Sequence, residues 1–196
     1  ITMKNVYLID IDGVLADYAQ AFCKYHNWLL YKKLKSTQLA KLPFNEHLKY
    51  DKKLYDCVKY LFRISGGEAL SPNLIKESKE FIDKVKKRGD VVIIWTARPT
   101  EEFPNLKLQT KIWLRKNKIK YDKLFFVEKG FDKEMFLVNS NLLLKYCLKN
   151  KYKIIAVDDR RLSPILNKFI DEIYLFDRNY NKQLKGRRIK SLSQLL

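Results

Sequence analysis

An apolar run near the N-terminus that ends in two carboxylates and a glycine most constrains how this chain can fold. Residues 6–14 read Val-Tyr-Leu-Ile-Asp-Ile-Asp-Gly-Val, and apolar residues at this density predict a strand buried in a parallel sheet. Asp10 and Asp12 follow where the strand ends, and their spacing points both side chains to the same side of the chain. Because ligands of open α/β sheets bind just beyond the carboxyl ends of strands, we expect a functional site here.

The pair of carboxylates itself predicts a cation or an uneven sharing of protons. Two like charges this close repel each other unless a metal ion neutralises them or one carboxyl group keeps its proton. Gly13 follows directly and allows the backbone to turn away tightly. We therefore expect Asp10 and Asp12 to share a metal site or to divide acid and base roles.

Apolar segments alternate with helical patterns along the rest of the chain. Further strands are predicted over 90–95, 121–127, 152–157 and 172–176. Helices are predicted over 15–34, 46–62, 106–116 and 141–150. This alternation predicts an α/β fold in which a five-stranded parallel sheet carries helices on both faces. The polar, basic segment 179–196 is expected to add at most a final turn.

The start of one more helix is predicted from its capping residues. Residues 65–72 are rich in serine and glycine and are typical of a loop. Ser71 is a favourable N-cap, and Pro72 suits the first helical position. We therefore expect a helix to begin there and to end at Gly89.

The connection between the first two predicted strands is longer than a single crossover helix requires. Residues 18–70 contain two extra helical stretches, and we interpret them as a small helical cap inserted after the first strand. Residues 3–17 and 71–196 would then form the core, with Met3 as the expected native start. Such a cap would cover the edge of the sheet where the functional site is expected.

Polar side chains capable of chemistry gather at the ends of three predicted strands. They are Asp10 and Asp12 after the first strand, Thr96 and Arg98 after the second, and Asp158 and Asp159 after the fourth. The carboxyl ends of parallel strands meet at one edge of the sheet, so these residues should converge.

The net charge of +18 invites a nucleic-acid partner, because basic surfaces bind phosphate backbones. The excess is mostly lysine, and codon bias in an AT-rich genome produces the same enrichment, so both explanations stay open. Three scattered cysteines, an odd number, predict a reduced, cytoplasmic protein. No apolar run approaches the roughly 20 residues that span a bilayer, so no membrane partner is expected.

Taken together, the three strand ends resemble the haloacid dehalogenase (HAD) superfamily of phosphohydrolases, which has a Rossmann-like core. The resemblance implies that Asp10 is the nucleophile that forms an aspartyl-phosphate, and that Asp12 is the general acid and then the general base. It also implies that Thr96 and the backbone N–H of Ala97 bind phosphoryl oxygens. Mg²⁺ is the implied cofactor, and its implied ligands are Asp10, Asp12 through its backbone carbonyl, Asp158 and Asp159.

The superfamily pattern also includes a lysine before the fourth strand that pairs with the nucleophile and the phosphate. A comparison with polynucleotide phosphatases would place it at Asn139, whereas nucleotidase-type relatives favour Lys129 or Lys133; Lys145 is also near. We predict Lys133. Arg98 and Arg160 are each interpreted either as a phosphate-binding or sugar-binding residue or as the partner of a nearby carboxylate.

Several parts of the chain are similar to the 5'(3')-deoxyribonucleotidase group: the helical insert, the segments 95–98 and 121–124, and the turn over 176–181. Residues 157–160 are also similar to the 3'-phosphatase domain of polynucleotide kinase. The resemblance therefore implies a phosphomonoesterase for (deoxy)nucleoside monophosphates. Hydrolysis of a 3'-phosphate at a nucleic-acid end is the alternative. A catalytically impaired nucleic-acid-binding module is an alternative of another class.

Overall fold

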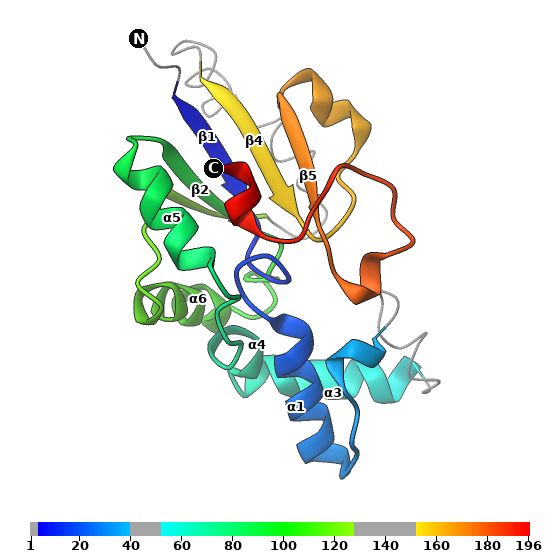
Figure 1. Cartoon of the computed structure of the whole chain (residues 1–196). Coiled ribbons are helices and arrows are strands. Elements are labelled where there is room, and N and C mark those ends of the chain that lie inside the picture. The colour runs from blue at the N-terminus through cyan, green and yellow to red at the C-terminus, as the bar shows by residue number, and fades with distance from the viewer. Residues whose placement is uncertain (1–3, 40–51, 128–151) are drawn as a thin grey trace.

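The computed structural model describes residues 4–39, 52–127 and 152–196 (Figure 1). The predicted helix over 141–150 and the first part of the one over 46–62 lie outside these ranges. The strands of the sheet are β1 (Asn5–Ile9), β2 (Val91–Thr96), β3 (Lys123–Phe126), β4 (Lys153–Asp158), β5 (Glu172–Phe176) and β6 (Arg188–Ile189). All pairs are parallel, in the order β3-β2-β1-β4-β5-β6. The apolar run at the N-terminus is therefore a central strand, as predicted.

The sheet has six strands, so the prediction of five was wrong. β6 pairs Arg188 with Leu175 and Ile189 with Phe176 of β5. It contains only two residues in a basic segment, and only Ile189 of the two is buried. Such a short strand leaves no alternation of apolar and polar residues that a sequence pattern would reveal.

The helices are α1 (Tyr18–Leu30), α3 (Lys52–Ile64), α4 (Gly67–Leu70), α5 (Ser78–Lys87) and α6 (Asn105–Lys116). Single turns of 3₁₀ helix are η1 (Ser36–Gln38), η2 (Pro164–Lys168), η3 (Asn179–Asn181) and η4 (Leu192–Leu195). Of the helices in the three described ranges, none combines the length and the apolar character that a membrane crossing requires.

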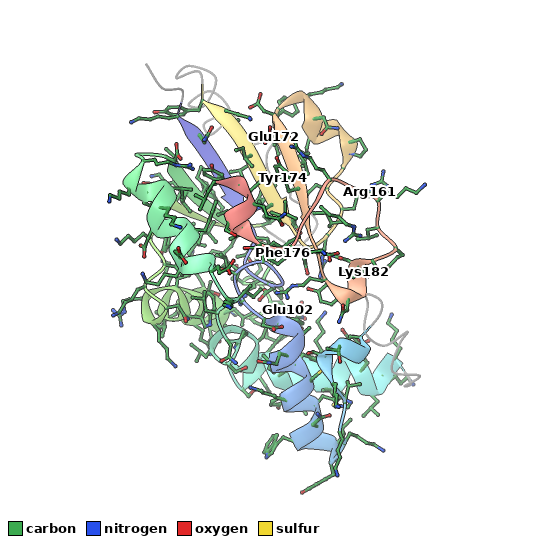
Figure 2. All side chains as sticks on the ribbon, in the orientation of Figure 1. Glu102, Arg161, Glu172, Tyr174, Phe176 and Lys182 are labelled. Carbon is green, nitrogen blue, oxygen red and sulfur yellow. The ribbon has the colours of Figure 1, made fainter. Side chains whose placement is uncertain are left out.

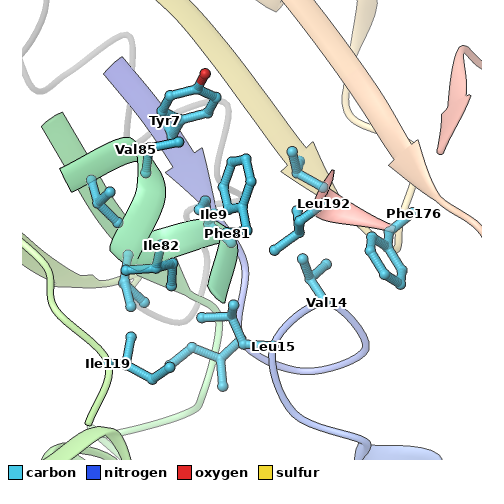
Figure 3. Packing of buried hydrophobic residues seen from close by; sticks show 14 of the residues in the cluster. Tyr7, Ile9, Val14, Leu15, Phe81, Ile82, Val85, Ile119, Phe176 and Leu192 are labelled. Atoms are coloured by element: carbon cyan, nitrogen blue, oxygen red, sulfur yellow. The ribbon is translucent and has the colours of Figure 1, made fainter. Parts of the chain in front are cut away.

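Alternate residues of β1 face two apolar layers, as expected for a strand covered on both sides. Tyr7 and Ile9 pack against Phe81 and other residues of α5 (Figure 3). Val6 and Leu8 face the opposite layer, which includes residues of η2. Figure 2 shows Glu172, Tyr174 and Phe176 in succession along β5, and the last two belong to the first layer.

The helix predicted to begin at Ser71 begins instead at Ser78. Ser71 closes α4, where its hydroxyl donates to the carbonyl of Gly67 at 2.5 Å. The carbonyl of Pro72 accepts a hydrogen bond from the Trp113 indole at 2.7 Å, and the N–H of Ile75 donates to the backbone of the loop after β1. These long-range bonds hold residues 72–75 in a non-helical conformation, which the local capping signal does not reveal.

Helices α1, α3 and α4 lie together beyond the carboxyl edge of the sheet (Figure 1). Helices α1 and α3 supply most of a separate buried cluster that includes Phe22, Tyr55, Val58 and Phe62, and Tyr180 of η3 also belongs to it. This arrangement places helical side chains over the strand ends. The division into a core and a cap stays a prediction.

Candidate active site

Three buried carboxylates lie together at the ends of the two central strands. Asp10 directly follows β1, and Asp158 and Asp159 lie at the end of β4 beside it. One ligand oxygen from each carboxylate lies within 4.8 Å of the others. The structure thus brings these predicted site residues together because β1 and β4 are neighbours in register, with Ile9 opposite Val157.

Hydrogen bonds orient the two carboxylates of β4. The N–H of Arg160 donates to Asp158 Oδ1 at 2.9 Å. The Tyr180 hydroxyl donates to Asp159 Oδ2 at 2.6 Å, and the Asn181 amide donates to the Asp159 carbonyl at 2.7 Å. Burial and the Asp159 carboxylate raise the pKa of Tyr180 well above its usual value, so the phenol keeps the proton that it donates.

Tyr180 and Asn181 have no role in the sequence-based site. In the sequence, their segment is distinguished only by its similarity to nucleotidases. Both belong to η3, and they reach Asp159 from 21 and 22 residues away. No local pattern indicates that contact.

Only glycine fits at position 13, beside this cluster of carboxylates. Its φ is +87°, a conformation that L-residues rarely adopt. An added Cβ would lie 2.2 Å from Asp159 Oδ2 and 2.4 Å from the Tyr180 hydroxyl oxygen. The Gly13 carbonyl also accepts a hydrogen bond from Arg178 Nε at 2.7 Å, which ties the loop after β1 to the segment that carries η3.

Asp12 stands apart from the other three carboxylates and pairs with Arg98. Arg98 Nε donates to Asp12 Oδ2 at 2.9 Å, and Nη2 donates to Oδ1 at 2.7 Å. The third nitrogen, Nη1, donates to the Thr110 hydroxyl at 2.9 Å, and Nη2 also reaches the Glu68 carbonyl at 3.4 Å. Of the two sequence-based interpretations of Arg98, the ion pair with a carboxylate is the one that this geometry displays.

The Arg98 side chain is 1% exposed, whereas that of Asp12 is 24% exposed. Burial lowers the pKa of Arg98, but the Asp12 and Glu68 carboxylates outweigh this effect and raise it. The guanidinium therefore stays charged inside the protein, and Asp12 keeps one side open to solvent.

Thr96 ends β2 and is buried. Because Ile94 pairs with Ile9 of β1, Thr96 lies two residues further along, level with the start of the acidic loop. Its hydroxyl accepts a hydrogen bond from the Arg98 N–H at 3.4 Å. Phosphate binding by Thr96 and Ala97 stays a prediction.

The candidate lysines lie outside the described residues. Lys129, Lys133 and Lys145 fall in the segment 128–151, as does Asn139. The choice of Lys133 therefore stays a prediction.

A charged group on the helical side of the site was missed from the sequence. Glu68 is buried on α4 and pairs with Arg63 of α3, whose Nε lies 2.5 Å from Glu68 Oε2. Burial raises the pKa of Glu68, and the charge of Arg63 opposes this shift. Glu68 falls in the segment predicted as a loop, and nothing in that local sequence indicates a buried acid.

No protein-family model and no curated protein matches the sequence. Solved structures do match. Protein tyrosine kinase A of Mycobacterium tuberculosis is 13% identical with a TM-score of 0.61, covering 100% of this chain and 97% of its own. A HAD family hydrolase from Deinococcus radiodurans, solved with bound phosphate and sodium, is 11% identical with a TM-score of 0.60, covering 100% and 94%.

A hydrolase from Streptococcus pneumoniae is 15% identical with a TM-score of 0.58, and the match covers 90% of this chain and 94% of that one. At these identities the likeness concerns the fold. The described sheet, with acidic residues at the ends of its two central strands, therefore has the fold of the haloacid dehalogenase-like hydrolases.

Proposed function

We propose that this protein is a phosphomonoesterase that works through an aspartyl-phosphate on Asp10. The observation that carries the proposal is the buried cluster of Asp10, Asp158 and Asp159 at the ends of adjacent parallel strands. Burying several carboxylates together is unfavourable unless a cation or a proton compensates them. A cluster of this kind at the ligand-binding edge of an α/β sheet supports a catalytic role over a purely structural one.

The donor set fits Mg²⁺. Three carboxylate oxygens lie close enough to share one ion, and Mg²⁺ prefers oxygen ligands such as these. Asp10, Asp158 and Asp159 would hold it, and the backbone carbonyl of Asp12 is the fourth proposed ligand. When bound, Mg²⁺ supplies positive charge that offsets the repulsion between these carboxylates and the substrate phosphate.

The proposed reaction has two steps, and each moves one proton through Asp12. First, a carboxylate oxygen of Asp10 attacks phosphorus, the bond from phosphorus to the alcohol oxygen breaks, and Asp12 donates its proton to that oxygen. Then Asp12 accepts a proton from water, whose oxygen attacks phosphorus and releases inorganic phosphate from Asp10. Thr96 and the N–H of Ala97 donate hydrogen bonds to the phosphoryl oxygens. Lys133 is the proposed cation at the phosphate, with Lys129 and Lys145 as the alternatives.

Arg98 is best assigned as a positioning residue for Asp12. All three guanidinium nitrogens already donate to protein acceptors. Direct binding of a phosphate by Arg98 would require its pair with Asp12 to open. A guanidinium only donates hydrogen bonds, so a protonated Asp12 must turn its O–H away from Arg98 and toward the leaving oxygen.

Nucleoside monophosphates are the proposed substrates, on the basis of the resemblance to 5'(3')-deoxyribonucleotidases. The net charge of +18 also suits the alternative, a 3'-phosphate at a nucleic-acid end. A catalytically impaired nucleic-acid-binding module remains the alternative of another class. The first two proposals differ in which phosphate ester is hydrolysed, and the binding module would hydrolyse none.

Release of inorganic phosphate from p-nitrophenyl phosphate, a deoxynucleoside monophosphate and a 3'-phosphorylated oligonucleotide, with and without Mg²⁺, tests the proposal. We expect turnover that depends on Mg²⁺ and falls by about a thousandfold or more in Asp10→Asn. Asp17→Asn is the matched control, since Asp17 caps α1 through the Gln20 N–H at 3.2 Å and asparagine caps helices equally well.

Full turnover in Asp10→Asn would contradict the covalent mechanism. A strong preference for the oligonucleotide would replace the nucleotidase assignment with the 3'-phosphatase. Absence of turnover on all three esters in the presence of Mg²⁺ would favour the binding module.

A further inference from the structure

The C-terminal end of α1 exposes two aromatic side chains. Trp28 is 71% exposed and Tyr31 is 95% exposed. The Trp28 ring contacts Tyr25, with ring centroids 5.7 Å apart. Among the described residues, the Tyr31 side chain has no hydrogen bond and no ring contact. Because exposed aromatic residues that lie together are typical of binding surfaces, this end of the helix is a candidate for one.

Tyr31 occupies a backbone position that usually belongs to glycine. It ends α1 with a φ of +51°, in the left-handed region that bulky residues rarely adopt. Its N–H donates to the Asn27 carbonyl, and the Asn27 side chain donates to the Leu34 carbonyl and accepts from the Leu34 N–H, both at 2.8 Å. Asn27 thus holds the turn after the helix in place. Neither packing nor backbone geometry favours an aromatic ring at this position, which supports a role in binding.

Lysines without ion pairs flank the two rings. Lys24, Lys32 and Lys33 are exposed, and none of them forms an ion pair within the part of the chain that the structure describes. The helix and the turn after it contain no aspartate or glutamate. Lys24, Trp28 and Tyr31 follow one another at intervals of four and three residues, which place them on one face of α1. Together with Lys32 and Lys33, they are called the α1 end surface below.

The composition of the α1 end surface favours one class of partner. Lysines bind the phosphates of nucleic acids, and aromatic rings stack on bases that are not paired. Insertion into a membrane interface instead requires a broad apolar helix face. The apolar residues of α1 are directed into the protein, where Phe22 is buried and Leu29 and Leu30 pack against the same cluster. The exposed face therefore suits single-stranded nucleic acid better than a lipid surface.

We propose that the α1 end surface binds single-stranded DNA or RNA, with its two rings stacked on bases and its lysines at phosphates. Figure 1 shows α1 extending away from the sheet. Its 13 residues span about 20 Å, so the surface lies well beyond the loop that carries Asp12. This binding goes beyond the proposed phosphatase function and does not depend on it.

Tryptophan fluorescence gives a direct test. Of the three tryptophans, Trp95 and Trp113 are buried, so the solvent-accessible emission comes from Trp28. An oligothymidylate of about 12 nucleotides with a 3'-hydroxyl, added without Mg²⁺, should quench this emission as a base stacks on the ring. Trp28→Phe should abolish the quenching but keep the affinity, measured by anisotropy of a labelled oligonucleotide. A duplex of the same length should bind more weakly, because its bases are already stacked.

Substitutions of the two rings separate binding from folding. Trp28→Ala and Tyr31→Gly should each weaken the affinity for the oligonucleotide about tenfold. Glycine adopts a positive φ without strain, so Tyr31→Gly should be at least as stable as the parent in urea denaturation. Its loss of affinity could then not come from unfolding.

Substitutions of lysines test the role of charge. Lys32→Met combined with Lys33→Met should reduce the slope of log affinity against log salt concentration by about 0.7 for each lysine. Lys107→Met combined with Lys111→Met is the matched control, because both lysines are exposed on α6 and their loss removes the same charge. The control should leave the slope unchanged.

Four outcomes would overturn the proposal. They are an unquenched Trp28, an affinity that Trp28→Ala does not change, equal affinity for the duplex, and an equal loss of slope in the α6 control, which would indicate binding through net charge alone. Binding to phosphatidylserine vesicles without binding to the oligonucleotide would also overturn it, in favour of a membrane. Phosphate release from small esters is measured separately, so failure of the proposed function does not affect this test.

Discussion

The two sides of the candidate site hold their charged residues in different ways. On the sheet side, Asp10 and Asp158 lie at the ends of paired strands, where the ladder of β1 and β4 holds the backbone. On the helical side, Arg63 and Glu68 lie on α3 and the four-residue α4, and side-chain contacts orient them. Reacting groups need closely defined positions, and rigid strands provide them better than short helices do. The comparison therefore supports the proposal that the chemistry takes place on the sheet side.

Arg98 joins the two sides. Its guanidinium pairs with Asp12 in the loop after β1 and also reaches the Glu68 carbonyl on α4. The loop after β2, which carries Arg98, thus contacts both the loop after β1 and α4. A change on either side should reach the other through this residue, and four substitutions test that division.

The largest effect is expected on the sheet side, from Gly13→Ala. The new methyl group would collide with the Asp159 carboxylate and the Tyr180 hydroxyl at a positive φ. We expect phosphatase activity to fall by more than about a hundredfold and the free energy of unfolding to fall by about 2–4 kcal/mol. Steady-state kinetics and urea denaturation measure the two effects.

Gly89→Ala is the control that separates the effect of the steric collision at position 13 from the effect of a side chain at a positive φ. Gly89 also has a positive φ, +83°, but its nearest contacts for a Cβ are side-chain atoms of Lys4 at 3.9 Å. We expect this variant to lose only about 1 kcal/mol of stability and to keep its activity. If Gly13→Ala were as active as Gly89→Ala, the loop would not be packed against Asp159 as described.

The second-largest effect is expected from Arg98, which contacts both sides of the site. Arg98→Met should lower the free energy of unfolding by about 3 kcal/mol, because it removes the buried cation that pairs with Asp12 and the donor to the Thr110 hydroxyl. If Arg98 positions Asp12, kcat should fall about tenfold to a hundredfold while KM changes little. A rise in KM with kcat unchanged would instead indicate that Arg98 binds the phosphate.

Two further variants control this prediction. Arg98→Lys cannot form the bidentate pair and should recover only part of the lost kcat. Arg187→Met removes an arginine whose side chain is 65% exposed from its pair with Glu172, and should change stability by less than about 1 kcal/mol.

A smaller effect is expected from Tyr180→Phe, which removes the donor to Asp159 Oδ2 at 2.6 Å. Loss of a hydrogen bond that orients a metal ligand typically weakens metal affinity by about tenfold. Titration of activity with Mg²⁺ measures the change. Tyr174→Phe is the matched control, since its hydroxyl donates to Glu172 at 2.9 Å on β5 and should leave the Mg²⁺ dependence unchanged. An unaltered Mg²⁺ requirement in Tyr180→Phe would contradict the assignment of Asp159 as a ligand.

The smallest effect is on the helical side and depends on pH. The pKa of Glu68 is raised in the folded protein, chiefly by burial. Its contribution to stability is therefore largest below the unfolded pKa of about 4.3, and it decreases as pH rises through the folded pKa. Glu68→Gln removes this dependence, so its stability relative to the parent should increase as pH rises from 4 to 7. Urea denaturation across that range measures it.

Glu77→Gln should show the opposite sign. A hydrogen bond from the Ser191 hydroxyl is the main reason that the pKa of Glu77 is lowered. Its contribution is present above the unfolded pKa and is lost as pH falls through the folded pKa. The stability of Glu77→Gln relative to the parent should therefore improve as pH falls below about 4. If the stabilities of the two variants relative to the parent changed with pH in the same direction, the pKa of Glu68 would not be raised. That result would contradict the buried environment of Glu68.

Much of the sheet side could be predicted from the sequence. A continuous apolar run signals a strand buried on both faces, and the polar residues that follow it lie at the strand end. The run before Asp10 and the run before Asp158-Asp159 both have this form. Because parallel strands end at one edge, the convergence of Asp10, Asp158 and Asp159 follows from local patterns combined with one topological rule.

The charged contacts of the helical side and the supporting contacts were decided only by the tertiary structure. The pair of Glu68 with Arg63, the bond from Tyr180 to Asp159 and the short strand β6 have no local signature. The predicted helix start at Ser71 failed for the same reason, since backbone bonds to the loop after β1 outweigh the local capping preference.

The sequence by itself therefore determined the parallel α/β sheet and the acidic residues at its carboxyl edge, because burial and strand ends are recorded in neighbouring residues. The tertiary structure alone decided that Arg98 pairs with Asp12, that Tyr180 orients Asp159 and that Arg63 pairs with the buried Glu68. The first two depend on the distance between residues that are far apart along the chain and the third depends on the burial of Glu68, and both exist only once the chain has folded.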